Sequence, residues 1–404
     1  MHYGHILAGR PGHARIAIRV PAKRAHNAFW VLPLVIFATK DTLTFTHGDV
    51  QATFVTLPAG KKLWFLARRR ADLGPDDRRD DMRSRLAFKS YDPWGDNTDV
   101  FVFEIVYLDQ YTTLLMPTPF LHLVITIEDS IGLGRHVVPA ANITACVYTA
   151  LHNTITGSAT TNADHESARQ FLVRIFIFWT LKLVDRGAPT RRERAHLPDL
   201  LRKEGVIDLL ALRSFVVLFV ALSRSLYKDS AVDQGLPLSD DMTKELSFAW
   251  KQAHAIVKHV EASYNFEVSS PVNQEEDADS ADIPDNFSAA ASSLLVNMAA
   301  SMYFYLVDEY DEKRKEKDGF TPSAFSLRLG QSLAMFDRHT ELGEGELFVD
   351  LSDDTAKEST LMQKFETMIA VEDEDEPDDQ SGPAPMLVLW DEASLPFVLK
   401  SKAE

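Results

Sequence analysis

The chain has 404 residues and a mass of 45.4 kDa, enough for two or three domains or for one large unit with two lobes. Apolar residues make up 45% and charged residues 25%, the values of a globular protein that can bury a sizeable core. The one cysteine, Cys146, excludes a disulfide framework and a cysteine-based zinc site. It fits a reducing compartment, so we expect a protein that is not secreted.

The net charge of −17 is unevenly distributed along the chain. Residues 1–95 carry a net charge of +8, residues 96–269 carry −4 and residues 270–404 carry −21. A basic block predicts contact with a polyanion, and an acidic block predicts an interaction or shielding role. The alternative is that the two blocks neutralise each other within the fold or between neighbouring copies of the chain.

The N-terminal part is predicted to be rich in β-strands. Residues 1–28 have the composition of a basic arm, and the apolar runs after it are punctuated by glycine, proline and aspartate, a pattern typical of hairpins. Within this part, His47, Gly48 and Asp49 are expected to form a turn. The predicted strands are Phe29–Ala38, Thr42–Thr46, Gln51–Leu57, Lys61–Ala67, Val100–Leu108 and Phe120–Glu128.

From about Pro139 the apolar residues recur at three- and four-residue spacing, which predicts helices. The sequence therefore predicts a mostly α protein with a β-containing N-terminal part, two-lobed and with extended N- and C-terminal arms. The predicted divisions are a basic arm at 1–28, an N-terminal lobe at 29–268, an acidic linker at 269–286, a helical C-terminal lobe at 287–370, and an acidic tether with an apolar arm at 371–404.

The apolar C-terminal segment must be buried somewhere, because hiding each large apolar side chain is worth roughly 1.5–3 kcal/mol. It either folds back on its own chain or docks into a groove on a neighbouring copy, which would build a homo-oligomer. For the second case the predicted oligomerisation residues are Leu387, Leu389, Trp390 and Phe397.

Motifs that carry enzyme chemistry are not found in the sequence. His254 and His259 are five residues apart, which is wrong for two imidazoles on one helix face. Cys146 lies in an apolar helical stretch, where a buried, unreactive thiol is expected. We therefore expect no catalytic residue, no metal, no cofactor and no enzymatic activity.

Two basic clusters contain the candidate binding residues, the first at Lys61–Lys89 and the second at Arg169–Lys203. The densest part of the second, Arg186–Arg194, is predicted to be a loop whose guanidinium groups can follow a phosphate backbone. Binding of this kind is independent of base sequence and sensitive to salt. The alternative is a solvated surface that pairs with interleaved carboxylates. The predicted RNA contacts are Arg186, Arg191, Arg192, Arg194, Lys182, Arg174, Arg68, Arg69 and Arg70.

In organisation, on the segments Arg10–Lys40, Arg186–Arg194 and Met386–Leu399, the chain resembles nucleoproteins of non-segmented negative-strand RNA viruses. The resemblance implies a viral nucleoprotein that clamps single-stranded RNA in a basic cleft and self-assembles through its terminal arms. It also implies a viral polymerase or phosphoprotein as partner, no membrane partner, and a location in the virion and the host cytoplasm or nucleus. The alternatives are a capsid protein of a small double-stranded RNA virus and a cellular scaffold or adaptor protein.

Overall fold

The computed structural model describes residues 32–49, 51–69, 101–118, 120–156, 166–184, 189–222, 227, 240–268, 284–308, 320–339, 359–370 and 395–402. The chain divides into two compact units, Met1–Ala168 and Arg169–Glu404. The described part of the first unit is mainly β-sheet and that of the second is mainly helical. The predicted fold class, mostly α with a β-containing N-terminal part, is confirmed.

The first unit contains one antiparallel sheet of six strands around a long central pair, β3 (Ala52–Arg69) and β6 (Leu121–Val137). Strands β1 (Leu32–Ala38) and β2 (Leu43–Gly48) follow one another along the free side of β6. Strands β4 (Phe101–Leu108) and β5 (Thr113–Met116) do the same along β3. The sheet thus has four rows. Strands β3 and β6 each fill one of the two central rows, and each outer row consists of two shorter strands, β1 with β2 and β4 with β5.

Strands β3 and β6 bend in the middle, where their register shifts between Thr56 and Lys62. Gly60 lies at this bend with a φ of +85°, and a Cβ there would come within 2.3 Å of the Asp129 carbonyl oxygen. Only glycine fits such a position. The sequence predicted two strands separated by Pro58–Gly60, but the ladder continues through these residues because the bulge absorbs them.

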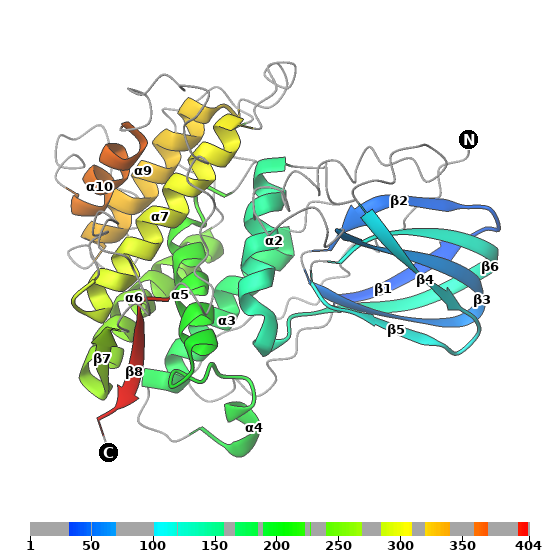
Figure 1. The fold of residues 1–404 in the computed structure, drawn as a ribbon, viewed down its shortest axis with the longest axis horizontal. Helices are drawn as coiled ribbons and strands as arrows, with labels where there is room; N and C mark the ends of the chain where they lie inside the picture. The colour runs from blue at the N-terminus through cyan, green and yellow to red at the C-terminus, as the bar shows by residue number, and fades with distance from the viewer. Residues whose placement is uncertain are drawn as a thin grey trace, which may run out of the picture. The chain divides into compact units, whose positions relative to one another are not determined.

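The sheet is rolled, so that its two halves face each other (Figure 1). Asp49 follows β2 beside the first residues of β6, yet it is hydrogen-bonded to Thr53, which pairs with His136 near the last residues of β6. One face of the sheet therefore becomes an interior. Its apolar core consists of Val55, Leu57, Trp64, Leu66, Leu108, Met116 and Val124.

Two short helical elements complete the described part of this unit, a 3-10 turn at Ala140–Asn142 and helix α2 at Ile143–Thr156. Cys146 is buried in α2, as expected from its apolar surroundings.

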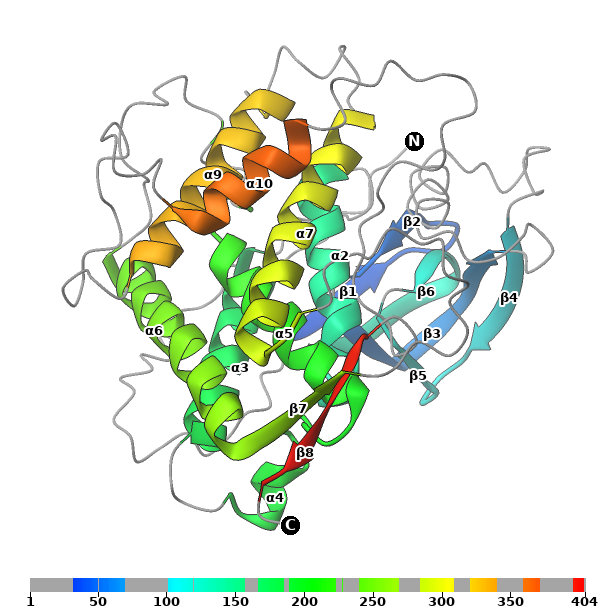
Figure 2. The same cartoon turned by 60° about the vertical axis from the view of Figure 1, so that its left-hand side comes forward.

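The second unit is a helical bundle around α7 (Phe287–Asp308), which packs against α5 (Lys203–Leu218), α6 (Asp240–Ser263), α9 (Pro322–Arg338) and α10 (Thr360–Ala370). Helices α9 and α10 lie side by side next to α7 (Figure 2). Helix α3 (Glu166–Val184) enters this unit from the end of the first, and α4 (Arg191–Arg194) is a single turn. In the described chain, α7 alone is long and apolar enough to cross a membrane, and 67% of that stretch is buried among its neighbours.

The bundle contains a buried charge, the guanidinium of Arg213, which is 4% exposed. It donates hydrogen bonds to the carbonyl oxygens of Ala253 and Ala291 and lies 5.2 Å from the centre of the Phe336 ring. The imidazole of His254 stacks on the same ring at 4.1 Å, and burial lowers the pKa of His254 to about 4, helped by the nearby Arg213. This histidine is therefore neutral in the fold at neutral pH.

The predicted divisions at 1–28, 269–286 and 371–404 fall wholly or mostly outside the described residues. Helices α6 and α7, on either side of the predicted acidic linker, pack against each other within the second unit. The division into compact units falls instead after Ala168.

Candidate metal centre

The described residues contain one group of side chains suited to hold a metal ion, consisting of His47, Asp49 and His122. One ligand atom of each residue can be chosen so that all of them lie within 4.8 Å of one another. His47 is the second-to-last residue of strand β2, Asp49 follows that strand directly, and His122 lies near the start of β6. Two imidazoles and a carboxylate therefore meet at one end of the rolled sheet.

The strand pairing brings the two imidazoles together. His47 and His122 are direct partners in the antiparallel ladder, and their ring centres are 4.2 Å apart. A bulge between Thr44 and His47 adds one residue to β2 and sets this pairing. The indole of Trp64, on the neighbouring strand β3, stacks on His122 at 5.1 Å and fixes the plane of that ring.

Hydrogen bonds orient each of these groups. The Nδ1 atom of His47 lies 2.7 Å from the Phe45 carbonyl oxygen, and that of His122 lies 2.9 Å from the Phe120 carbonyl oxygen. A carbonyl can only accept, so each Nδ1 carries a proton and each Nε2 keeps its lone pair. Metal-binding histidines in proteins are held in the same way. The hydroxyl of Thr53 donates to Oδ2 of Asp49 at 2.9 Å, which leaves Oδ1 for a ligand.

The electrostatics of the group also suit a cation. Burial lowers the pKa of His122 to about 4, with a further contribution from His47, so His122 is neutral and able to coordinate at neutral pH. Burial raises the pKa of Asp49, but His122, His47 and His136 outweigh it and the net pKa lies below the usual value. The carboxylate is therefore ionised. His122 is buried while His47 and Asp49 are half-buried, so the group is partly accessible to solvent.

A second set of polar groups lies on the same inner face of the sheet. In the register of β3 and β6, Leu66 is opposite His122 and Lys62 is opposite Thr126, so all four side chains point to one side. Lys62 is 2% exposed, and burial lowers its pKa to about 8. In the described chain the hydroxyl of Thr126 and the indole N–H of Trp64 are buried without a hydrogen-bond partner. Burial alone accounts for the lowered pKa of Lys62, with no contribution from a neighbouring carboxylate.

Comparison with known proteins gives only distant likenesses. No protein family and no curated protein matches the sequence. Solved structures similar to the chain include YcfD, a ribosomal oxygenase from Escherichia coli, in complex with cobalt and succinic acid, at 11% identity over 61% of this chain and 54% of that chain, with a TM-score of 0.19. Another structure of Escherichia coli YcfD matches at 13% identity over 58% of this chain and 52% of that chain, also with a TM-score of 0.19. The chain spans about half the length of the structures it matches.

These findings correct two predictions from the sequence. The similar solved structures are of a ribosomal oxygenase and not of viral nucleocapsid proteins, which contradicts the viral nucleoprotein and its capsid alternative. They also contradict the expectation of a protein without enzymatic activity, as does the presence of the His47, Asp49 and His122 group. At TM-scores of 0.19 the likeness assigns no chemistry to this chain, and the chemistry of the site follows from its own side chains.

Several of the predicted RNA contacts make ion pairs within their own unit. Arg174 makes a two-pronged ion pair with Glu245 at 2.6 and 3.1 Å, and Lys182 lies 2.9 Å from Glu193. Arg68 is exposed and lies 3.4 Å from Glu104. On α4, three further predicted contacts, Arg191, Arg192 and Arg194, are exposed. The side chain of Arg69, and all of Arg70 and Arg186, lie outside the described residues.

Phe397, one of the predicted oligomerisation residues, is buried within its own chain. It belongs to β8 (Phe397–Ser401), which pairs with β7 (Tyr264–Val268), and its ring stacks on Phe266 at 4.5 Å and meets the edge of Phe287 at 6.1 Å. The end of the chain thus folds back on itself, the other outcome that the sequence allowed. Leu387, Leu389 and Trp390 lie outside the described residues, and homo-oligomerisation stays a prediction.

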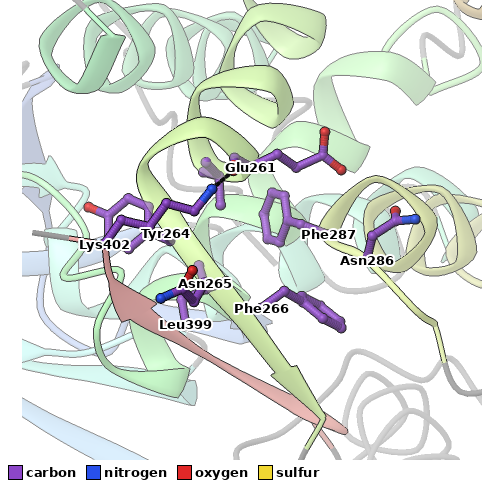
Figure 3. Close-up of a pocket in the computed structure, with 9 residues that line it drawn as sticks. Glu261, Tyr264, Asn265, Phe266, Asn286, Phe287, Leu399 and Lys402 are labelled. Atoms are coloured by element: carbon purple, nitrogen blue, oxygen red, sulfur yellow. Dashed lines mark hydrogen bonds between the residues drawn. The ribbon is translucent and has the colours of Figure 1, made fainter. Parts of the chain in front are cut away.

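A pocket of 250 Å³ lies beside this strand pair, between the end of α6 and the start of α7 (Figure 3). Its charged side chains serve the fold. Lys402 donates to the backbone carbonyl of Glu261 at 2.7 Å, and the carboxylate of Glu261 accepts from the backbone N–H of Ser288 at 3.0 Å in the first turn of α7. The first contact holds the C-terminal strand against α6, and the second caps the first turn of α7.

None of the three candidate ligands was predicted from the sequence, because His47–Asp49 was assigned to a turn and His122 to a strand with no site attached. The signal was present as a His-x-Asp pattern at the end of a predicted strand, followed by a histidine in a later strand, His122. The observed turn begins only after Gly48, so His47 still points inward with the ladder. Spacing rules for helices cannot find ligands that strand pairing brings together.

Proposed function

We propose that the first unit is a mononuclear non-haem iron(II) oxygenase that uses a 2-oxo acid as co-substrate. The observation that carries the proposal is the meeting of His47, Asp49 and His122 at one end of the rolled sheet, within 4.8 Å. Two histidines and one carboxylate on one side of a metal, with the other positions open, are the ligand set of non-haem iron(II) oxygenases.

The residues fit such a metal. Both imidazoles have their Nδ1 proton bound to a backbone carbonyl and their Nε2 lone pair available. The carboxylate supplies one negative charge, so a bound divalent cation keeps a net positive charge that attracts an anionic co-substrate. The group is partly accessible to solvent, which leaves room for that molecule and for dioxygen.

Lys62 and Thr126 supply a place for the far carboxylate of a 2-oxo diacid. An ammonium buried without a partner costs several kcal/mol, whereas one paired with a carboxylate and a hydroxyl is stabilised. Lys62 and His122 are separated along the strands by about 13 Å, four residues at ~3.3 Å each, and the flexible lysine stem shortens this gap. Thr126 and the indole N–H of Trp64 offer two further donors between them.

With iron bound, the centre would supply the reduction of dioxygen, one oxygen atom going to the organic substrate and the other to the 2-oxo acid, which loses carbon dioxide. This chain's own residues do the rest. His47, His122 and Asp49 hold the cation, Trp64 keeps the His122 ring in plane, and Lys62 orients the co-substrate by its far end. The apolar core around Leu66 and Val124 keeps bulk water from the interior.

Metal binding by the purified full chain tests the proposal. Electron paramagnetic resonance titration with Mn²⁺ should show one site per chain, which Asp49→Ala and His122→Ala abolish. His152→Gln is the matched control, since His152 is another buried histidine of the same unit and belongs to no ligand group. Anaerobic loading with Fe²⁺ and exposure to air should then consume 2-oxoglutarate and release succinate. Absence of a stoichiometric site in the wild type, or equal binding by the two alanine variants, would refute the proposal.

A further inference from the structure

A chain of hydrogen bonds runs from the candidate ligand Asp49 to a third histidine outside the ligand group. The Thr53 hydroxyl lies 2.9 Å from Oδ2 of Asp49 and 2.7 Å from Nδ1 of His136. Thr53 is buried, with 3% of its surface exposed. Its other acceptor, the Gln51 carbonyl oxygen, is farther away at 3.4 Å, so the Asp49 carboxylate has the shorter bond.

The direction of these bonds follows from the number of protons. A threonine hydroxyl has one proton to give, and an ionised carboxylate can only accept. The proton of Thr53 therefore points to Asp49, and the oxygen of Thr53 accepts from His136, whose Nδ1 must carry a proton. Along this series of hydrogen bonds His136 donates to Thr53 and Thr53 donates to Asp49. The tautomer of His136 that has its proton on Nδ1 is thereby selected.

The strand topology shows what these hydrogen bonds connect. Thr53 and His136 are direct partners near the start of β3 and the end of β6, whereas the imidazoles of His47 and His122 are paired near the other end of β6. Asp49 lies where the rolled sheet brings these ends together. Its carboxylate is thereby anchored to one half of the sheet while the two imidazoles are anchored to the other.

We propose that Thr53 and His136 are positioning residues of the metal centre, which hold the Asp49 carboxylate at the geometry that the two imidazoles require. The inference rests on the proposed function, since it concerns the same site. Outer partners of this kind change metal affinity by about 10- to 100-fold when they are removed. Neither residue belongs to the ligand group, and the hydrogen bonds from both reach that group at Asp49.

The competing explanation is that Thr53 only closes the turn between β2 and β3. A residue with that role changes the thermal stability of the metal-free protein but leaves the affinity of the folded protein for metal unchanged. The two explanations therefore differ in the Kd for Mn²⁺ measured on folded protein.

The test measures the Mn²⁺ Kd of the purified full chain by electron paramagnetic resonance, together with the melting temperature without metal. Thr53→Val should weaken binding about 10- to 100-fold, and Thr53→Ser, which keeps the hydroxyl, should bind within a few-fold of the wild type. The control is Thr56→Val on the same strand, which removes an exposed hydroxyl contact to Thr113 and should leave the Kd unchanged.

Variants of His136 provide a second test, in which Thr53 and the turn between β2 and β3 are unchanged. His136→Leu should weaken binding, and His136→Asn, whose amide N–H can donate in place of Nδ1–H, should restore most of it. The double variant Thr53→Val/His136→Leu should lose less affinity than the two single losses combined, because the hydrogen bond of His136 reaches Asp49 through the Thr53 hydroxyl. Kd values of Thr53→Val and His136→Leu within twofold of the wild type would overturn the inference while leaving the metal site standing. A wild type that binds no Mn²⁺ would instead refute the proposed function itself.

Discussion

Replacing Lys62 with methionine should make the protein more stable and less able to bind its co-substrate. Lys62 is buried, and burial lowers its pKa from 10.5 to about 8. A shift of this size corresponds to about 3 kcal/mol, at ~1.36 kcal/mol per pKa unit. The folded state bears this cost whenever the lysine is charged. Methionine has a similar length and no charge to bury.

The sign of the pH dependence follows from the same shift. Between pH 8 and 10.5 the unfolded chain keeps the lysine proton that the folded chain has lost, so the free energy of unfolding rises with pH in this window. Below pH 8 the cost is present in full, and above pH 10.5 it is gone. The Lys62→Met variant should lack this rise.

Thermal unfolding followed by circular dichroism, without metal, checks both points. At pH 7 we expect Lys62→Met to unfold at a temperature about 6–12 °C higher, since ~1 kcal/mol moves the midpoint of a domain of this size by roughly 2–4 °C. The control is Lys61→Met, which removes an exposed lysine paired with Glu128 and should change stability by less than about 1 kcal/mol. A Lys62→Met protein that is less stable than the wild type at pH 7 would refute the reasoning. With metal, 2-oxoglutarate should stabilise the wild type and not the variant.

Three further changes test the second unit. Phe397→Ala should lower the free energy of unfolding by about 3–5 kcal/mol in urea titrations, because it empties a fully buried site between two aromatic rings; a loss below 1 kcal/mol would contradict this packing. Gly205→Ala should cost at least ~2 kcal/mol, since a Cβ there would lie 2.2 Å from the Asp199 carbonyl oxygen, and a melting temperature equal to that of the wild type would disprove the contact. The pKa of His254 is lowered to about 4, so stability should fall as the pH drops from 6.5 towards 4, by at most about 3 kcal/mol. His254→Gln should show a smaller loss between pH 7 and 5, and an unchanged loss would mean that other groups cause it.

Much of the fold could be predicted from local sequence patterns. The spacing of apolar residues found the helices of the second unit, and alternation found most strands of the first. The continuous course of β3 could not be found, because Pro58–Gly60 reads locally as a break and only the ladder with β6 shows that the strand bends there and goes on.

The spacing and alternation of apolar residues could not predict the candidate site. His47 and His122 are far apart in the sequence, and nothing local indicates that they pair across two strands. Lys62 was counted in the first basic cluster, because a run of lysines and arginines has the same composition whichever way each side chain points. Lys61 and Lys62 are neighbours on one strand, so their side chains point to opposite faces, and only the rolling of the sheet makes one of those faces an interior.

The bend at Gly60 also limits how this protein can change over evolutionary time. In a strand, inserting or deleting one residue reverses which side chains face inward. A single insertion in β3 between Gly60 and Lys62 would turn Lys62 and Trp64 outward together while leaving Thr53 in place. An insertion before the bend would do the opposite. The lengths of the two arms of this strand should therefore be inherited almost unchanged, and loops beyond the strand ends are where the chain can lengthen without losing its interior.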